Sequence, residues 1–262
     1  MQSSVDISWI QLALFSMVLL LPLLINRYYQ LSMTKEVLIA VARMAVQLIS
    51  VGLYLHYVFS FNNLWVNIGW IILMVVIGSS AIVGKAKLPK RVIFMPVACG
   101  LSVALLPLML LLCYLVIRPV PIYSAQYVIP LAGMLLGNSL SSNIVALQHL
   151  FEGFAQRRSE YEAAIALGAN PFQAANPFVI DALKKAQAPI LASMATTGLV
   201  TLPGMMTGQI LAGISPILAI KYQLVILIAI FVMITVSLAI TLQLSLRRTL
   251  CKTGRIKVKP LG

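Results

Sequence analysis

Residues 92–117 read VIFMPVACGLSVALLPLMLLLCYLVI and contain no charged side chain. A helix that crosses a bilayer needs about 20 mainly apolar residues, so this stretch by itself predicts a membrane span. Six further stretches have the same character, namely 7–25, 37–59, 64–83, 128–150, 188–213 and 219–246. We therefore expect an all-α integral membrane protein with about seven transmembrane helices. The weakest span is 188–213, which carries several threonines and Pro203.

The composition excludes most classes of soluble protein. Of the 262 residues, 61% are apolar and 10% are charged, and the mean hydropathy is +0.99. Because a soluble domain carries about 25% charged residues, the chain is neither an ordinary cytosolic enzyme nor a disordered protein. The net charge of +13 would suggest nucleic acid in a soluble protein. Here the basic residues must first be placed relative to the bilayer, and we expect no nucleic-acid partner.

The basic residues predict how the chain lies in the membrane, because Lys and Arg accumulate on the cytoplasmic side of short loops. With the N-terminus outside, 16 of the 19 Lys and Arg residues fall on that side, most of them in a loop at 151–187 and a tail at 247–262. This predicts a cytoplasmic C-terminus and a single transmembrane domain over 1–262. The other basic residues are Arg118 and Lys221 near the outer face, Lys221 next to Tyr222, and Arg43 within the second span.

The chain shows no pattern of a catalytic site. It has no spaced Cys/His cluster and no pair of carboxylates within a span. Gly78–Lys85 looks like a phosphate-binding loop, but Ala86 stands where Ser or Thr would contact Mg²⁺. We therefore expect no catalytic residue and no cofactor in this chain. Since a charge at the bilayer centre is costly, Arg43 should extend toward the cytoplasmic face or pair with a neighbouring helix.

Residues 159–174 predict two short helices separated by a turn. In the first helix, the spacing of Tyr161, Ala164 and Ile165 is that of one helical face. Gly168 can adopt the left-handed conformation that ends a helix. Asn170 can cap the next helix, with Pro171 at its first position.

The second of these helices carries an apolar stripe, formed by Phe172, Ala175, Val179, Ala182 and Leu183. Asp181 and Lys185 are spaced to pair on its outer side. A helix pair this short cannot bury its own stripe, so we expect it to lie on the bilayer or to dock into another protein.

The sequence Glu162-Ala163-Ala164-x-x-x-Gly168-Ala169 resembles the EAA loop of ATP-binding-cassette (ABC) permeases, which inserts into a groove on a separate ATPase subunit. The resemblance implies that a cytoplasmic ATPase, carrying ATP and Mg²⁺, is a partner. The residues that would contact it are Glu162, Ala163, Ala164, Gly168, Asn170 and Pro171. An amphipathic loop at the membrane surface with no partner is the alternative.

Two glycine motifs echo each other in the fifth and sixth spans. Residues 131–138 and 202–209 both read Leu-x-Gly-Met-x-x-Gly followed by an amide side chain, and Pro130 and Pro203 are placed to perturb the helices. Small residues four apart let helices pack closely, so one interpretation is packing of these spans or of two copies of the chain. The other is a transport path. The residues concerned are Gly133, Met134, Gly137, Asn138, Pro203, Gly204, Met205, Met206, Gly208 and Gln209.

These motifs, with Pro216–Gln223, resemble the FetB-type family of ABC permeases, which includes iron exporters and plant proteins linked to aluminium tolerance and UDP-glucose transport. The resemblance implies a permease of the bacterial inner membrane, present in two copies, that exports iron or another metal. Met134, Met205 and Met206 are the candidate metal ligands, although thioethers suit Cu(I) more than iron. The alternatives are a UDP-glucose permease and a seven-helix scaffold or sensor without transport.

Overall fold

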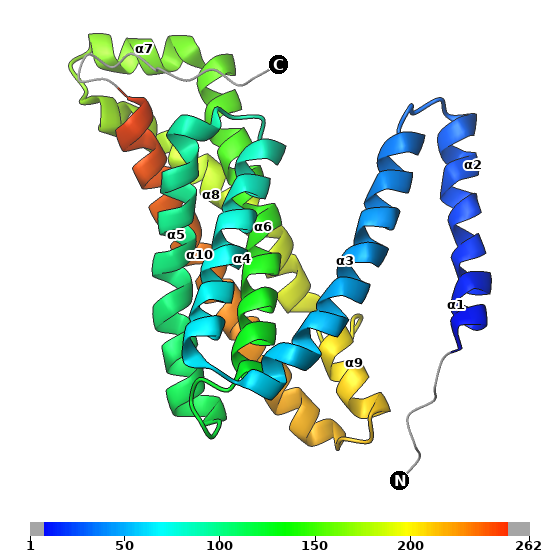
Figure 1. Ribbon diagram of the computed structural model, residues 1–262. Coiled ribbons are helices and arrows are strands. Elements are labelled where there is room, and N and C mark those ends of the chain that lie inside the picture. The colour runs from blue at the N-terminus through cyan, green and yellow to red at the C-terminus, as the bar shows by residue number, and fades with distance from the viewer. Residues whose placement is uncertain (1–7, 251–262) are drawn as a thin grey trace.

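The computed structural model describes residues 8–250, and the described chain is built from helices (Figure 1). The all-α fold predicted from the sequence is therefore confirmed. In chain order the elements are α1 (Trp9–Ser16), the 3₁₀ turn η1 (Met17–Leu19), α2 (Leu20–Tyr28), α3 (Thr34–Phe61), α4 (Leu64–Lys85), α5 (Lys90–Leu111), the π-helical segment η2 (Leu112–Ile117), α6 (Ala125–Gln156), α7 (Arg158–Ala166), α8 (Pro171–Thr196), α9 (Gly204–Leu211) and α10 (Pro216–Thr249).

Within the described range, six segments are long and apolar enough to cross a membrane. They are Trp9–Tyr28, Thr34–Phe61, Leu64–Lys85, Lys90–Ile117, Ala125–Gln156 and Pro216–Thr249. Each corresponds to a predicted span. Local signals mark where the helices begin: the Asn63 side chain accepts a hydrogen bond of 2.9 Å from the Trp65 amide at the start of α4, and Pro216 occupies the first turn of α10.

The core lies between α4, α5, α6, α8 and α10 (Figure 1). Its largest fully buried side chains belong to four of these helices and include Ile82, Leu105, Leu147, Met233 and Leu238. At Gly100 the backbone of α5 approaches α10 so closely that a Cβ would lie 2.9 Å from the Ser237 carbonyl oxygen. This glycine is what allows the two helices to pack at that distance.

Helices α1 to α3, which we call the arm, stand away from this bundle (Figure 1). In the most apolar stretch of α3 no residue is buried. The arm joins the bundle only near the end of α3, where Tyr54 stacks on Trp70 with ring centroids 4.4 Å apart. There Val58 also packs with Ala125 and Ile129. The arm therefore leaves one side of the bundle open.

The sixth predicted span, 188–213, is not one helix. Its first part is the end of α8, its last part is α9, and residues 197–203, called the break, lie between them. Gly198 has a φ of 90°, and Pro203 lacks an amide hydrogen and disfavours a helical conformation at Leu202. Helices α8 and α9 together still connect the end of the molecule at α7 with the opposite end (Figure 1). The number of bilayer crossings thus remains a prediction.

The predicted loop 151–187 is also mostly helical. Helix α6 continues to Gln156, and the second predicted short helix is the beginning of the long α8. The turn between α7 and α8 follows the prediction: Gly168 has a φ of 93°, and the Asn170 side chain accepts a hydrogen bond of 3.1 Å from the Phe172 amide. Pro130, in contrast, lies inside a continuous α6 and does not break it.

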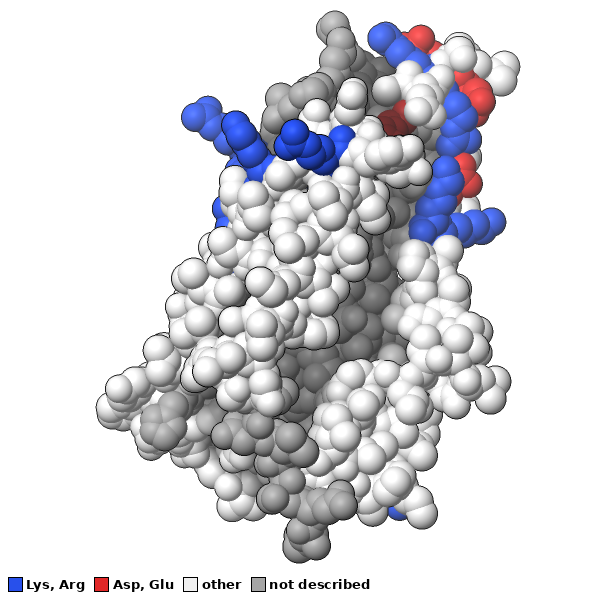
Figure 2. Space-filling model, turned by 90° about the vertical axis from the view of Figure 1, so that its right-hand side faces the viewer, with Lys and Arg blue, Asp and Glu red and all other residues white. Residues whose placement is uncertain are grey.

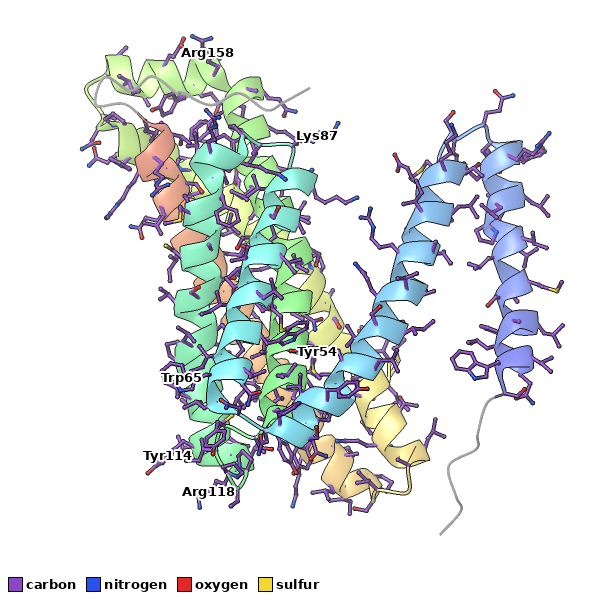
Figure 3. All side chains as sticks on the ribbon, in the orientation of Figure 1. Tyr54, Trp65, Lys87, Tyr114, Arg118 and Arg158 are labelled. Atoms are coloured by element: carbon purple, nitrogen blue, oxygen red, sulfur yellow. The ribbon has the colours of Figure 1, made fainter. Side chains whose placement is uncertain are left out.

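Charged side chains gather at the α7 end. On the face in Figure 2, most of the Lys and Arg and the visible carboxylates lie in the upper part, and the lower part is almost entirely uncharged. Figure 3 places Lys87 and Arg158 at this end and Arg118 at the opposite end. Residues 1–7 and the tail from 251 onward lie outside the described residues, so the predicted positions of the two termini stay predictions.

Candidate functional site

Helix α7 is fixed to the bundle by three buried aromatic side chains. Phe154 of α6 stacks on Phe178 of α8 with ring centroids 4.8 Å apart. Tyr161 of α7 meets Phe154 edge to face at 5.3 Å, and burial raises the pKa of its phenol. We call these three residues the aromatic cluster. The face of α7 that includes Tyr161 thus packs inside this chain. The expectation that the apolar stripe of the next helix would be covered by the bilayer or by another protein was wrong for four of its residues, which pack within this chain: Ala175, Val179, Ala182 and Leu183. Phe172, the fifth, is exposed.

Arg157, at the junction of α6 and α7, strengthens the same contact. Its guanidinium lies 4.6 Å from the centre of the Phe178 ring and donates a hydrogen bond of 2.8 Å to an Asp181 carboxylate oxygen. The predicted pairing of Asp181 with Lys185 is therefore not found, since Asp181 is turned toward α7. Arg157 also lies 3.8 Å from Glu160. One cation thus connects the helices α6, α7 and α8.

The outward side of α7 carries the predicted contacts for an ATPase. Glu162 is exposed, and its carboxylate accepts a hydrogen bond of 2.7 Å from Arg158. Ala163 is exposed, whereas Ala164 is half-buried against the bundle. Leu167 is 90% exposed and was not among the predicted contacts. Its position one residue before the helix-ending glycine is the sequence signal that could have identified it.

Around this turn, Gly168 and Asn170 are exposed and Pro171 is half-buried. The Asn170 amide donates to the Gln173 side chain at 3.1 Å, which completes a capping box at the start of α8. The turn is therefore stabilised by local hydrogen bonds, and Asn170 and Pro171 position the outward side of α7 whether or not they contact a partner.

A cavity of about 330 Å³ lies between α6, α9 and α10 near the opposite end of the molecule. Its lining brings together several of the predicted path residues, because Met134 of α6 and both Met205 and Gln209 of α9 contribute to it. Gln126, Tyr127 and Tyr222 add polar groups, and the remaining lining is apolar: Leu112, Ile117, Pro130, Leu131, Ile214, Leu218, Val225 and Ile226. Sequence reasoning missed Gln126 and Tyr127, which belong to no motif.

The polar groups of this cavity carry no formal charge. The side-chain oxygen of Gln209 is buried and has no hydrogen-bond partner among the described residues, so it is available to a bound molecule. Burying a polar atom without a partner costs free energy. The two thioether sulfurs are soft donors and this amide oxygen is a hard one, and all three are neutral.

Other predicted path residues lie elsewhere. Met206 is buried but does not line the cavity, because successive helical side chains point about 100° apart. Asn138 is exposed and donates a hydrogen bond of 2.8 Å to the Met134 carbonyl oxygen within α6. Lys221 and Arg43 are exposed and are not in the cavity lining, and no ion pair of Arg43 is found among the described residues.

The four motif glycines differ in their surroundings. A Cβ at Gly133 would lie 3.2 Å from the end of the Met74 side chain, so this glycine serves packing of α6 against α4. At Gly137, Gly204 and Gly208 a Cβ would meet no atom within 4 Å. Close packing of the fifth and sixth predicted spans through these glycines is therefore not found within the described chain.

The fold and these two regions define a multi-pass helical membrane protein with a neutral cavity near one end. At the other end lies α7 with the turn that follows it, residues 158–171, which we call the platform. The family described as "Uncharacterised protein family (UPF0014)" matches residues 9–250, and the chain belongs to this family. This confirms the resemblance to FetB-type proteins.

Named relatives come from bacteria and plants. The chain is 33% identical to the UPF0014 membrane protein YjkA of Bacillus subtilis, over 83% of this chain and 86% of that protein. It is 33% identical to the protein ALUMINUM SENSITIVE 3 of Arabidopsis thaliana, over 80% and 76%. It is 30% identical to the probable iron export permease protein FetB of Escherichia coli, over 82% of each chain. No solved structure matches the chain.

Proposed function

We propose that this chain is the membrane subunit of an ABC transporter in a bacterial inner membrane, exporting iron or another metal ion. A separate cytoplasmic ATPase, which binds ATP and Mg²⁺, drives transport. The α7 end faces the cytoplasm in this proposal, because the basic side chains gather there (Figures 2 and 3). The name of the Escherichia coli relative supports the choice of cargo.

The observation that carries the proposal is the path of α8. This helix of 26 residues, about 39 Å long at 1.5 Å per residue, begins beside the outward side of α7. It ends at the break, just before the α9 residues that line the cavity. The aromatic cluster and Arg157 hold α7 to α8, so a displacement of α7 by an ATPase moves α8 with it. The break lets α9 respond separately and change the shape of the cavity.

The lining of the cavity favours a metal over a sugar nucleotide. The diphosphate of UDP-glucose needs cationic partners, and the cavity residues include no Lys or Arg. Met134 and Met205 offer two thioether sulfurs, which are ligands for soft metal ions. Within the described residues, no three His, Cys, Asp or Glu side chains come together. The cargo therefore meets thioethers and an amide oxygen in the cavity.

The test is a charge reversal on the platform. We expect Glu162→Lys to abolish co-purification of the ATPase and ATP-dependent metal export, because it puts a cation where a carboxylate contacts the partner. The matched control is Glu36→Lys, an exposed carboxylate at the same end of the molecule, in the first turn of α3. Unchanged ATPase association and export in Glu162→Lys would contradict the proposal.

A further inference from the structure

A groove of about 420 Å³ lies in the arm, between α2 and the start of α3. None of its lining residues belongs to the cavity between α6, α9 and α10. The turn from α2 to α3 is at the α7 end of the molecule (Figure 1), directly after the first apolar span, which ends at Tyr28. The groove therefore lies where that span reaches the membrane surface.

One face of α2 leads from apolar side chains to a cation. Leu20, Leu23, Leu24 and Arg27 all line the groove, and their spacing is that of one helical face. Leu20 lies about 10 Å along the helix from Arg27, at 1.5 Å per residue. Arg27 is in the last turn of α2, and an arginine at the end of a span extends to the membrane surface. The leucines are therefore level with lipid acyl chains and the guanidinium is level with lipid phosphates.

The turn after α2 adds hydrogen-bond donors close to this cation. Gln30, Ser32 and Thr34 complete the polar part of the lining, and all three are exposed. An amide or a hydroxyl can donate to an anionic oxygen. Arg27 is also exposed, and its guanidinium forms no ion pair within residues 8–250. The groove thus offers an uncompensated cation together with neutral donors.

The shape of the groove is fixed by a buried side chain. Asn26 is 5% exposed, and its Nδ2 donates a hydrogen bond of 2.9 Å to the Thr34 hydroxyl oxygen. Its Oδ1 accepts a bond of 3.3 Å from the Met33 amide, and its backbone carbonyl accepts one of 3.0 Å from the Leu31 amide. Because Thr34 accepts from Asn26, the hydroxyl hydrogen of Thr34 is left to donate elsewhere.

We propose that this groove binds an anionic phospholipid of the leaflet at the α7 end. The phosphate lies at Arg27 and the donors of the turn, and an acyl chain follows Leu24 and Leu20 into the bilayer. Basic pockets between membrane helices bind anionic lipid head groups through this kind of charge complementarity. Residues 20–43 carry three basic side chains against one carboxylate, so the local charge is positive. The inference needs only the membrane location of the chain and goes beyond the proposed role with an ATPase.

Native mass spectrometry of the full chain in a mild detergent tests the site, with phosphatidylglycerol and phosphatidylcholine added in equal amounts. We expect the wild type to retain phosphatidylglycerol in preference to phosphatidylcholine. Arg27→Gln should weaken the binding of phosphatidylglycerol about fivefold, the effect of one cation beside an anionic lipid. The matched control is Lys85→Gln, which removes a cation from the last turn of α4 outside the groove and should bind as the wild type does.

A second variant fills the groove without changing its charge. Leu24→Trp should also weaken the binding of phosphatidylglycerol, because the indole occupies the place of the acyl chain. Its control is Leu21→Trp on the same helix, since Leu21 is 60% exposed against 62% for Leu24 and lies outside the lining. This control should leave binding unchanged.

Three results would overturn the proposal. The first is binding equal to that of the wild type in either Arg27→Gln or Leu24→Trp, and the second is an equal loss in Lys85→Gln. The third is displacement of phosphatidylglycerol by inorganic phosphate at the same concentration, which would assign the groove to a soluble anion that makes no use of the leucines. All of these measurements omit the ATPase, so their failure is distinguishable from failure of the proposed function.

Discussion

The close approach of α5 and α10 at Gly100 leads to a prediction about stability. In Gly100→Ala the new methyl group would lie 2.9 Å from the Ser237 carbonyl oxygen and 3.1 Å from the Thr241 backbone nitrogen, and it would collide with the Thr241 hydroxyl oxygen. The hydroxyl can rotate away, but the two backbone atoms can move only if the helices separate. Overpacking of this kind costs about 1–3 kcal/mol. Because backbone is involved, we expect the upper half of that range.

The measurement is the free energy of unfolding in mixed micelles, from titration with a denaturing detergent. A loss of about 2–3 kcal/mol corresponds to a roughly 30- to 160-fold change in the folding equilibrium. Gly69→Ala is the control, since a Cβ at this helical glycine of α4 meets nothing within 4 Å. It should be neutral or slightly stabilising, because alanine favours helix more than glycine does.

A second variant separates the two sources of the clash. Thr241→Ala removes the hydroxyl but leaves the Ser237 carbonyl in place, so it should rescue Gly100→Ala only in part. Full rescue would show that only the side chain is in conflict. If Gly100→Ala were as stable as Gly69→Ala, α5 and α10 would not approach as described, and the packing of the core would need revision.

Three further predictions concern the platform, the cavity and the topology. Phe178→Ala should lower stability by about 3–5 kcal/mol and make the turn after α7 more sensitive to limited proteolysis; resistance equal to that of the wild type would contradict the role of the aromatic cluster. Met134→Leu combined with Met205→Leu keeps the side-chain volume nearly constant and should reduce metal export at least about tenfold, because even the loss of a residue that only supports a metal ligand has an effect of that size. Met206→Leu should leave export unchanged. Equal export by all variants in inverted vesicles would remove the thioethers from the path. A reporter fused after Gly262 should be active in the cytoplasm and one fused before Met1 outside, and finding both on one side would exclude an odd number of crossings.

Hydropathy and local turn chemistry predicted the features that depend on neighbours in the sequence. The spans followed from uninterrupted apolar length, because a bilayer imposes that requirement on each segment separately. The turn at Gly168, Asn170 and Pro171 was also predicted correctly, because it too depends only on nearby residues. A left-handed glycine and a capping amide act within a few residues of themselves.

Other features depended on partners far away in the sequence. Asp181 pairs with Arg157 instead of Lys185, because the junction of α6 and α7 brings a cation 24 positions earlier into contact with α8. Spacing along one helix could not show this. In the same way, spacing along the helix placed Tyr161 on an apolar face, but only its contacts with Phe154 and Phe178 show what covers that face.

The sequence by itself determined that this protein is a helical membrane protein and that two glycine motifs deserve comparison. Only the tertiary structure decided that Met134 and Met205 share one cavity while Met206, the next residue, does not. Only the tertiary structure showed that the span 188–213 is interrupted. The physical reason is that hydropathy measures how much apolar surface a segment has. Which side of a helix meets which neighbour is set by packing between segments that the chain connects only at a distance.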